Sequence, residues 1–190
     1  GILSVRLDER TGAIGSVEDT SLVGTIEDTS LALLAMLGAG YTDRGSAKDN
    51  RYAKCVRGGL RFLLSVQDVE GSFADRSQAG WLRAHAVATL ALSEAYWMTR
   101  NPRYKKPAQD GLDLLMRVRT RGAGWGDGSR IGEDDTIMTI WAMLALRSGK
   151  YAGLQVDPDA LEGVRTLLDA RHGSLTPTEQ AGAALGRILL

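Results

Sequence analysis

Apolar side chains recur along this chain at the spacing of helices rather than of strands. In three segments they follow one another at intervals of three and four residues, which gathers them on one face of a helix. The segments are 52–64, 104–118 and 161–168, and their other faces carry Arg, Lys and Asp. No window alternates β-branched and polar residues as a half-buried strand would. The pattern therefore predicts an all-α chain in which these three helices are amphipathic.

Four further segments are apolar or small on nearly every side, which is typical of helices buried on most of their surface. They cover residues 29–37, 85–98, 136–146 and 178–189. Short turns with a small pair and an apolar anchor precede them at intervals of roughly 50–60 residues, as in repeat proteins. These turns are Gly12-Ala-Ile14, Gly71-Ser-Phe73, Ala123-Gly-Trp125 and Gly173-Ser-Leu175.

Buried helices that alternate with amphipathic helices at a fixed period predict helical hairpins in two layers. We expect about 3.5 hairpins in one domain over residues 1–190, with the buried helix of each hairpin inside and its amphipathic partner outside. Such an array is a toroid-like, partial α/α barrel. Because the chain direction alternates, the inner helices should all point the same way, and their N-termini should share one rim.

Composition and charge fit a soluble globular domain and exclude two classes of partner. The 190 residues are 44% hydrophobic and 24% charged, with a formal net charge of zero. Basic residues alternate with acids instead of forming a patch, so nucleic acid is not an expected partner. The longest apolar runs reach about half of the ~20 residues that cross a bilayer, so no transmembrane segment is predicted. The sequence opens without Met, and we expect it to be a piece of a longer protein; its compartment is not indicated.

Little in the sequence indicates a metal or another cofactor. One cysteine, Cys55, and two histidines, His85 and His172, are present, and none stands at a usual zinc-ligand spacing. The glycine-rich stretch 122–128 follows a helix and contains no Lys, so a phosphate loop is not expected. We therefore expect neither metal nor cofactor, and we expect Cys55 to act as a small core residue.

One repeat unit resembles the Gln/Trp motif of squalene and oxidosqualene cyclases. It covers residues 58–73 and places Gln67 and Phe73 at the Gln and Trp positions of that motif. The next copy, residues 111–125, keeps the Trp but has Arg119 at the Gln position. The resemblance implies the α/α toroid that these cyclases share with the β subunits of protein prenyltransferases.

Two of the buried segments are similar to bacterial squalene-cyclase-like repeat proteins. They lie at residues 29–42 and 85–96, and the resemblance extends over most of the chain. Members of that group are often parts of larger, membrane-associated chains, which implies the same for the parent of this chain. One fold can carry unrelated activities, so the function needs an argument of its own.

An acidic cluster stands where class II triterpene cyclases carry an Asp-x-Asp-Asp-Thr motif. The chain reads Gly132-Glu133-Asp134-Asp135-Thr136, with Gly132 in place of the first Asp. The resemblance implies that Asp134 is a proton donor, with Asp135 and Glu133 as neighbouring carboxylates. A donor of this kind needs a dry pocket and nearby acids that keep it protonated.

The same acids have a simpler interpretation as helix caps. An Asp directly before a helix accepts hydrogen bonds from free backbone N–H groups, which stabilises the helix by about 0.5–2 kcal/mol. Asp135 and Asp28 each stand directly before a buried segment. Two copies of one arrangement favour capping over catalysis. His85, expected at the matching helix start, is either a partner of the acidic cluster or a hydrogen-bonded histidine of the helix wall.

Two functions remain open at this point. The first is a non-catalytic repeat domain that binds a protein segment or an isoprenoid-like apolar ligand through its inner rim or concave face. Its candidate binding residues are Trp141, Asp28 and Trp81. The second is an isoprenoid cyclase or prenyltransferase-like enzyme with Asp134, Asp135, Glu133 and His85 as candidate catalytic residues. We favour the first, because the chain is only 6% aromatic and half a ring encloses little. The open ends of such an array would also allow a homodimer.

Overall fold

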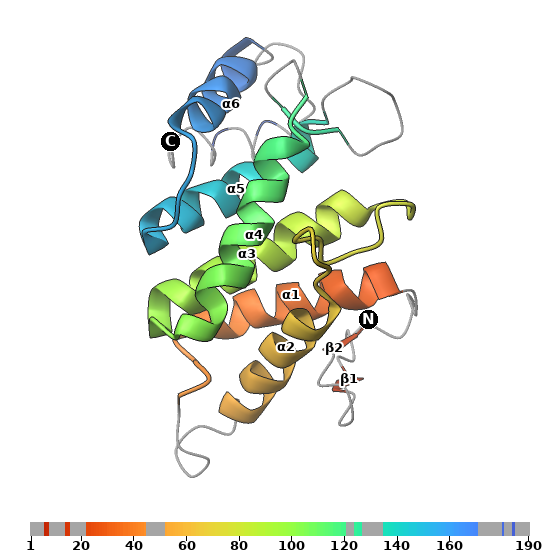
Figure 1. Ribbon diagram of the computed structural model, residues 1–190, viewed down its shortest axis with the longest axis vertical. Coiled ribbons are helices and arrows are strands. Elements are labelled where there is room, and N and C mark those ends of the chain that lie inside the picture. Colours follow the sequence, from red (N-terminus) through yellow and green to blue (C-terminus); the bar gives the residue numbers. More distant parts are fainter. Residues whose placement is uncertain are drawn as a thin grey trace.

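The computed structural model describes residues 6–7, 14–15, 22–44, 52–120, 124–126 and 135–170 and the single positions 180 and 184. The helices are α1 (Leu22–Gly38), α2 (Ala53–Val66), α3 (Trp81–Thr99), α4 (Pro102–Arg117), α5 (Thr136–Ala152) and α6 (Pro158–Ala170) (Figure 1). Two short strands, β1 (Arg6–Leu7) and β2 (Ile14–Gly15), pair in antiparallel fashion. Apart from this pair, the described residues confirm the predicted all-helical chain. The predicted helix 178–189 lies outside them except at positions 180 and 184.

The helices form two sets with different surroundings. α1, α3 and α5 lie side by side with α3 in the middle, and α2, α4 and α6 each pack against the helix that precedes them in the chain (Figure 1). The C-terminal ends of α1, α3 and α5 meet around one groove, whereas Arg83 near the start of α3 pairs with Glu27 of α1. Trp81 and Ile137, at the starts of α3 and α5, also line one hollow. The three helices therefore point the same way, as predicted.

The central helix α3 shows the deepest burial. Every residue from 84 to 93 is buried, because α1 and α5 flank the helix and α4 covers it. The amphipathic helices α2, α4 and α6 bury one stripe each, as the three-and-four spacing predicts. Among their residues, Leu60, Leu112 and Val164 are fully buried. The division is thus confirmed for α3 and α5 and for the three amphipathic helices. α1 differs from the prediction, because it buries one stripe that includes Leu33 and Leu37 while Leu31 is 38% exposed.

Two helix starts differ from the prediction. α1 begins at Leu22 rather than at Thr29, and α3 begins at Trp81 rather than at His85. In α1 the added turns bury Val23 and Ile26, which extend the apolar stripe backwards. In α1 the carboxylate of Asp28 stands before an apolar run and resembles a cap, so the sequence alone placed that start too late. In α3 the helix includes Trp81 and Leu82 and begins directly after Gly80.

Glycines of α2 and α4 allow each helix to approach its inner neighbour closely. A Cβ atom on Gly59 would lie 3.0 Å from Leu33 Cδ2 of α1, and one on Gly111 would lie 2.7 Å from Thr89 Oγ1 of α3. Each glycine stands directly before a fully buried Leu, Leu60 or Leu112. α2 therefore lies closer to α1, and α4 closer to α3, than a residue with a side chain at either glycine position would allow.

The Gln/Trp-like turns tie neighbouring hairpins together. Gln67 Nε2 donates hydrogen bonds to Gly71 O at 3.1 Å and to Pro107 O of α4 at 2.9 Å. In the next repeat, Arg119 stands at the Gln position and its Nη1 donates to Asp159 O of α6 at 3.1 Å. The residue at this position thus links each turn to the following outer helix, although its chemistry changes from amide to guanidinium.

The apolar anchors of these turns are buried and hydrogen-bonded. Trp125 is fully buried, and its Nε1–H donates to Leu115 O at 2.8 Å. Its backbone N–H donates to Thr139 Oγ1 at 3.0 Å. The backbone N–H of Phe73 donates in the same way to His85 Nδ1 at 3.3 Å. Each turn is therefore fastened to a side chain in the first turns of the following inner helix.

Candidate functional site

The predicted acidic cluster is only partly described. Glu133 and Asp134 lie outside the described residues. Asp135 is the N-cap of α5: its Oδ1 accepts a hydrogen bond from Met138 N–H at 2.6 Å, and its backbone N–H donates to Trp125 O at 2.7 Å. The capping interpretation of Asp135 is confirmed.

The matching cap at Asp28 was predicted wrongly. Because α1 begins at Leu22, Asp28 lies inside the helix rather than before it. The neighbouring acid Glu27 has a different role, since its carboxylate pairs with Arg83 Nε at 3.0 Å. Glu27 therefore joins α1 to α3, and the arrangement at Asp135 is not repeated in α1.

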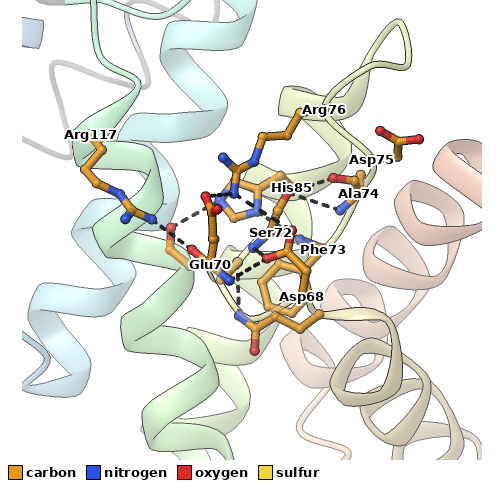
Figure 2. A network of polar contacts seen from close by, with 12 residues as sticks. Asp68, Glu70, Ser72, Phe73, Ala74, Asp75, Arg76, His85 and Arg117 are labelled. Atoms are coloured by element: carbon orange, nitrogen blue, oxygen red, sulfur yellow. Dashed lines mark hydrogen bonds and ion pairs between the residues drawn. The ribbon is translucent and has the colours of Figure 1, made fainter.

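His85 is a buried histidine of the helix wall and does not lie at the helix start. Its Nδ1 accepts from Phe73 N–H at 3.3 Å, and its Nε2 lies 3.1 Å from Gly111 O of α4, so Nε2 carries the proton. Its ring stacks on Phe73 with 5.5 Å between ring centroids (Figure 2). Burial lowers the pKa of His85 to about 4. His85 shares no hydrogen bond or ion pair with Asp135. Asp134, the member of the acidic cluster with which His85 was predicted to pair, lies outside the described residues.

The turn between α2 and α3 holds His85 in place (Figure 2). Asp68 Oδ1 accepts from Glu70 N–H at 2.9 Å and from Ser72 N–H at 2.8 Å. Glu70 in turn pairs with Arg76 at 2.8 Å and accepts a hydrogen bond from Arg117 of α4 at its carbonyl. The polar residues around His85 therefore bond to one another and build the turn.

A hollow of about 660 Å³ lies at the N-terminal ends of α3 and α5, on the predicted rim. Trp81 is half-buried there, with its ring centroid 6.2 Å from that of His85. The charged side chains that line the hollow are Arg76, Arg83 and Asp135. Arg76 pairs with Glu70, Arg83 pairs with Glu27, and Asp135 caps α5. The charges of this rim hollow are therefore already engaged.

A second hollow lies at the opposite, C-terminal ends of α1, α3 and α5, and we refer to it as the apolar groove. Its volume is about 550 Å³. Its lining is Leu34, Leu37, Gly38, Gly40, Leu90, Glu94, Trp97, Met98, Leu144, Arg147, Ser148 and Tyr151. Trp97 is 49% exposed and Tyr151 is 63% exposed, although both are large and mainly apolar. Exposed aromatic surface gathered in a hollow is typical of a binding site.

One face of α5 runs from the rim hollow to the apolar groove. Ile137 lines the first, and Leu144 and Tyr151 line the second. Trp141 stands between them at helical spacing and is half-buried against the core. The predicted binding residue Trp141 therefore lies on the same face as the groove, whereas Asp28 and Trp81 line no part of it.

The sequence analysis did not select the residues of the apolar groove. A signal for the groove was present in α5, where Ile137, Trp141, Leu144 and Tyr151 follow one another at intervals of four, three and seven residues and are half-buried or exposed. That stripe was hidden because the rest of α5 is also apolar, so the helix looked buried on every side. Trp97 of α3 was hidden for the same reason.

The described residues contain no group of three or more His, Cys, Asp or Glu side chains placed to hold a metal ion. Cys55 is free and half-buried on α2. Within the described part of the chain, no helix has the length and apolar character needed to cross a membrane.

Comparison with known proteins gives no indication of function, so the function is argued from the geometry of the site. No protein-family model matches the chain, and no curated protein matches its sequence.

Proposed function

We propose that this chain is a non-catalytic α/α repeat domain that binds an apolar ligand in the groove at the C-terminal ends of α1, α3 and α5. The observation that carries the proposal is the exposure of Trp97 and Tyr151 inside a hollow that four leucines and Met98 also line. Single exposed apolar residues are ordinary, but a cluster in a concavity marks a site from which a ligand displaces water.

The shape of the layers supports the same proposal. Three inner helices that point the same way, each followed by an outer helix, are the arrangement of a segment of an α/α toroid. In this proposal the apolar groove lies on the concave side of such a segment. Repeat arrays commonly bind their ligands on that side, because the curvature gathers side chains from several repeats.

The size of the groove favours a small ligand over a folded protein. Ligand pockets occupy about 300–1,000 Å³, and the groove of about 550 Å³ falls within that range. The interface of a stable protein complex extends over about 800 Å² on each partner, far more than three helix ends present. A protein segment is therefore the second choice for the occupant.

The contacts of Asp135 and of His85 support a non-catalytic domain. Asp135 is engaged as a helix cap, and both ring nitrogens of His85 are engaged with Phe73 and Gly111. A general acid needs a proton-bearing group within reach of substrate, and His85 has no exposed surface. In their present contacts both residues serve the fold.

Binding of an apolar dye tests the proposal. The neutral dye N-phenyl-1-naphthylamine should bind the domain with increased fluorescence, and Trp97→Ala should weaken that binding about tenfold, because an anchoring aromatic residue contributes most of the contact area. Leu22→Ala is the matched control, since Leu22 is 54% exposed but lies at the other end of α1. Equal weakening by the two variants would contradict the assignment of the groove, and absence of dye binding would contradict the function.

A further inference from the structure

Glu94 brings an unpaired negative charge to the apolar groove. It lies half-buried on α3, lines the groove, and makes no hydrogen bond or ion pair with any described residue. A carboxylate that is partly removed from water without a partner is unfavourable. A positively charged group that enters the groove would therefore gain a charge-assisted hydrogen bond to Glu94.

Arg147 of α5 also lines the groove, but it is already engaged. Its Nη2 donates to Tyr151 Oη at 2.6 Å, and its guanidinium carbon lies 4.9 Å from the centroid of that ring. Arg147 and Tyr151 also line a neighbouring hollow of about 570 Å³ formed by α5 and α6, so they lie on the α6 side of the groove. An anion in the groove has to share Arg147 with Tyr151, whereas a cation meets in Glu94 a charge without a partner.

Trp97 offers an aromatic face beside Glu94. Residues three apart on a helix have their Cβ atoms about 5–6 Å apart, so the side chains of Glu94 and Trp97, which both line the groove, can reach one bound group. Trp97 is 49% exposed. The face of an indole ring attracts a cation, and of the three aromatic side chains it does so most strongly. A carboxylate and a ring face together are suited to bind an ammonium group.

Three helix dipoles favour the same sign of charge. α1, α3 and α5 all end at the groove, where Leu37, Trp97 and Tyr151 belong to their last turns. The C-terminus of a helix carries about half a negative elementary charge, which favours a cation nearby. Arg100 at this end of the molecule follows that rule, because its Nη1 donates to the carbonyl of Ala152, the last residue of α5.

We infer that the ligand of the apolar groove has a positively charged end, an ammonium group that Glu94 and Trp97 bind while the leucines of the groove hold its apolar chain. This inference rests on the proposed function. A neutral end would leave Glu94 unpaired, and a carboxylate end would be repelled by Glu94 and by the three helix ends.

Three probes with the same apolar chain test the inference. Octylammonium, 1-octanol and octanoate are each titrated at pH 7.5, below their micelle concentrations, against the dye-loaded domain. We expect octylammonium to displace the dye at about tenfold lower concentration than 1-octanol, and octanoate to be the weakest, because only the ammonium group gains the contacts with Glu94 and Trp97. Equal displacement by octylammonium and 1-octanol, or preference for octanoate, would overturn the inference while the proposed function stands. Displacement by none of them would also overturn it, and binding of the dye itself tests the proposed function separately.

Matched variants assign the preference to residues. Glu94→Gln keeps the size of the side chain and removes its charge, so the advantage of octylammonium over 1-octanol should fall to about twofold or less while 1-octanol is unaffected. Glu162→Gln is the control, since Glu162 is exposed on α6 and lines the neighbouring hollow but not the groove. It should leave the ratio unchanged. Melting temperatures by circular dichroism show that each variant is folded.

Salt tests the charge without a variant. In the native chain the advantage of octylammonium should decrease several-fold as sodium chloride is raised from about 0.05 to 0.5 M, because ions screen a partly exposed charge pair. An unchanged ratio in Glu94→Gln, an equal loss in Glu162→Gln, or a ratio that does not respond to salt would each overturn the inference.

Discussion

His85 should make the stability of the domain fall as the pH is lowered from 6.5 towards 4. The neutral ring accepts a hydrogen bond from Phe73 N–H at Nδ1, so a proton on Nδ1 would face another donor. The ring is also enclosed between Phe73 and the backbone of α4. Burial lowers the pKa of His85 from 6.5 to about 4, and the protonated form is therefore strongly disfavoured in the folded chain.

The size of the effect follows from the two pKa values. The unfolded chain takes up the proton near pH 6.5, but the folded chain does so only near pH 4. The contribution of His85 is complete above pH 6.5, decreases as the pH falls between these values, and is lost below pH 4. A shift of this size corresponds to about 3 kcal/mol in total, of which about 2.5 kcal/mol is lost by pH 4.5.

Urea unfolding followed by circular dichroism at pH 7.5, 6.5, 5.5 and 4.5 measures this loss. His85→Gln removes the titrating group and keeps an amide that can accept from Phe73 and donate to Gly111. The difference between the native chain and this variant isolates His85 from the carboxylates that also titrate here. A matched His172→Gln variant shows how much of the slope the second histidine supplies. If the native chain and His85→Gln lose the same stability between pH 6.5 and 4.5, the conclusion that His85 is neutral and buried in the folded chain is wrong.

Two further predictions concern the packing and capping that hold the helices. Asp135→Ala should lower the free energy of unfolding by about 1 kcal/mol, because α5 loses its cap, and Asp135→Asn should lower it by about a few tenths of a kcal/mol. Both variants should keep the affinity for the dye. Loss of dye binding without loss of stability would instead indicate a direct role for Asp135 in binding. Gly111→Ala should cost about 1–3 kcal/mol, because its Cβ would lie 2.7 Å from Thr89 Oγ1, whereas Gly38→Ala meets nothing within 4 Å and should not destabilise. Recovery of much of the lost stability by adding Thr89→Ala to Gly111→Ala would assign the cost to that contact, and its absence would refute it.

The helical architecture could be predicted because its periodicity is local. The amphipathic segments have one apolar stripe, and the structure places α2, α4 and α6 on them with small differences at the ends. The parallel direction of α1, α3 and α5 follows from the alternation of chain direction. The start of α1 was less predictable, since an acid beside an apolar run is found inside helices as well as before them.

The functional surface could not be predicted because it depends on which side of an apolar helix is left uncovered. Trp97 and Leu92 both belong to the apolar helix α3, yet Trp97 is 49% exposed and Leu92 is fully buried. The packing of α1, α4 and α5 around α3 decides this difference, and the sequence of α3 does not record it. The acidic motif instead marked residues whose described contacts are structural: Asp135 caps α5, and Glu27 pairs with Arg83.

The four tryptophans of the chain offer the most direct test of the apolar groove. Each indole N–H gives its own signal in a nitrogen-proton correlation spectrum, and titration with N-phenyl-1-naphthylamine reports which indoles meet the bound dye. Trp97 lines the groove, Trp81 lines the rim hollow, and Trp125 is buried in a turn. We predict a saturable shift of the Trp97 signal with little change at Trp81 and Trp125. A shift at Trp81 while Trp97 stays constant would contradict the account, as would four unchanged signals.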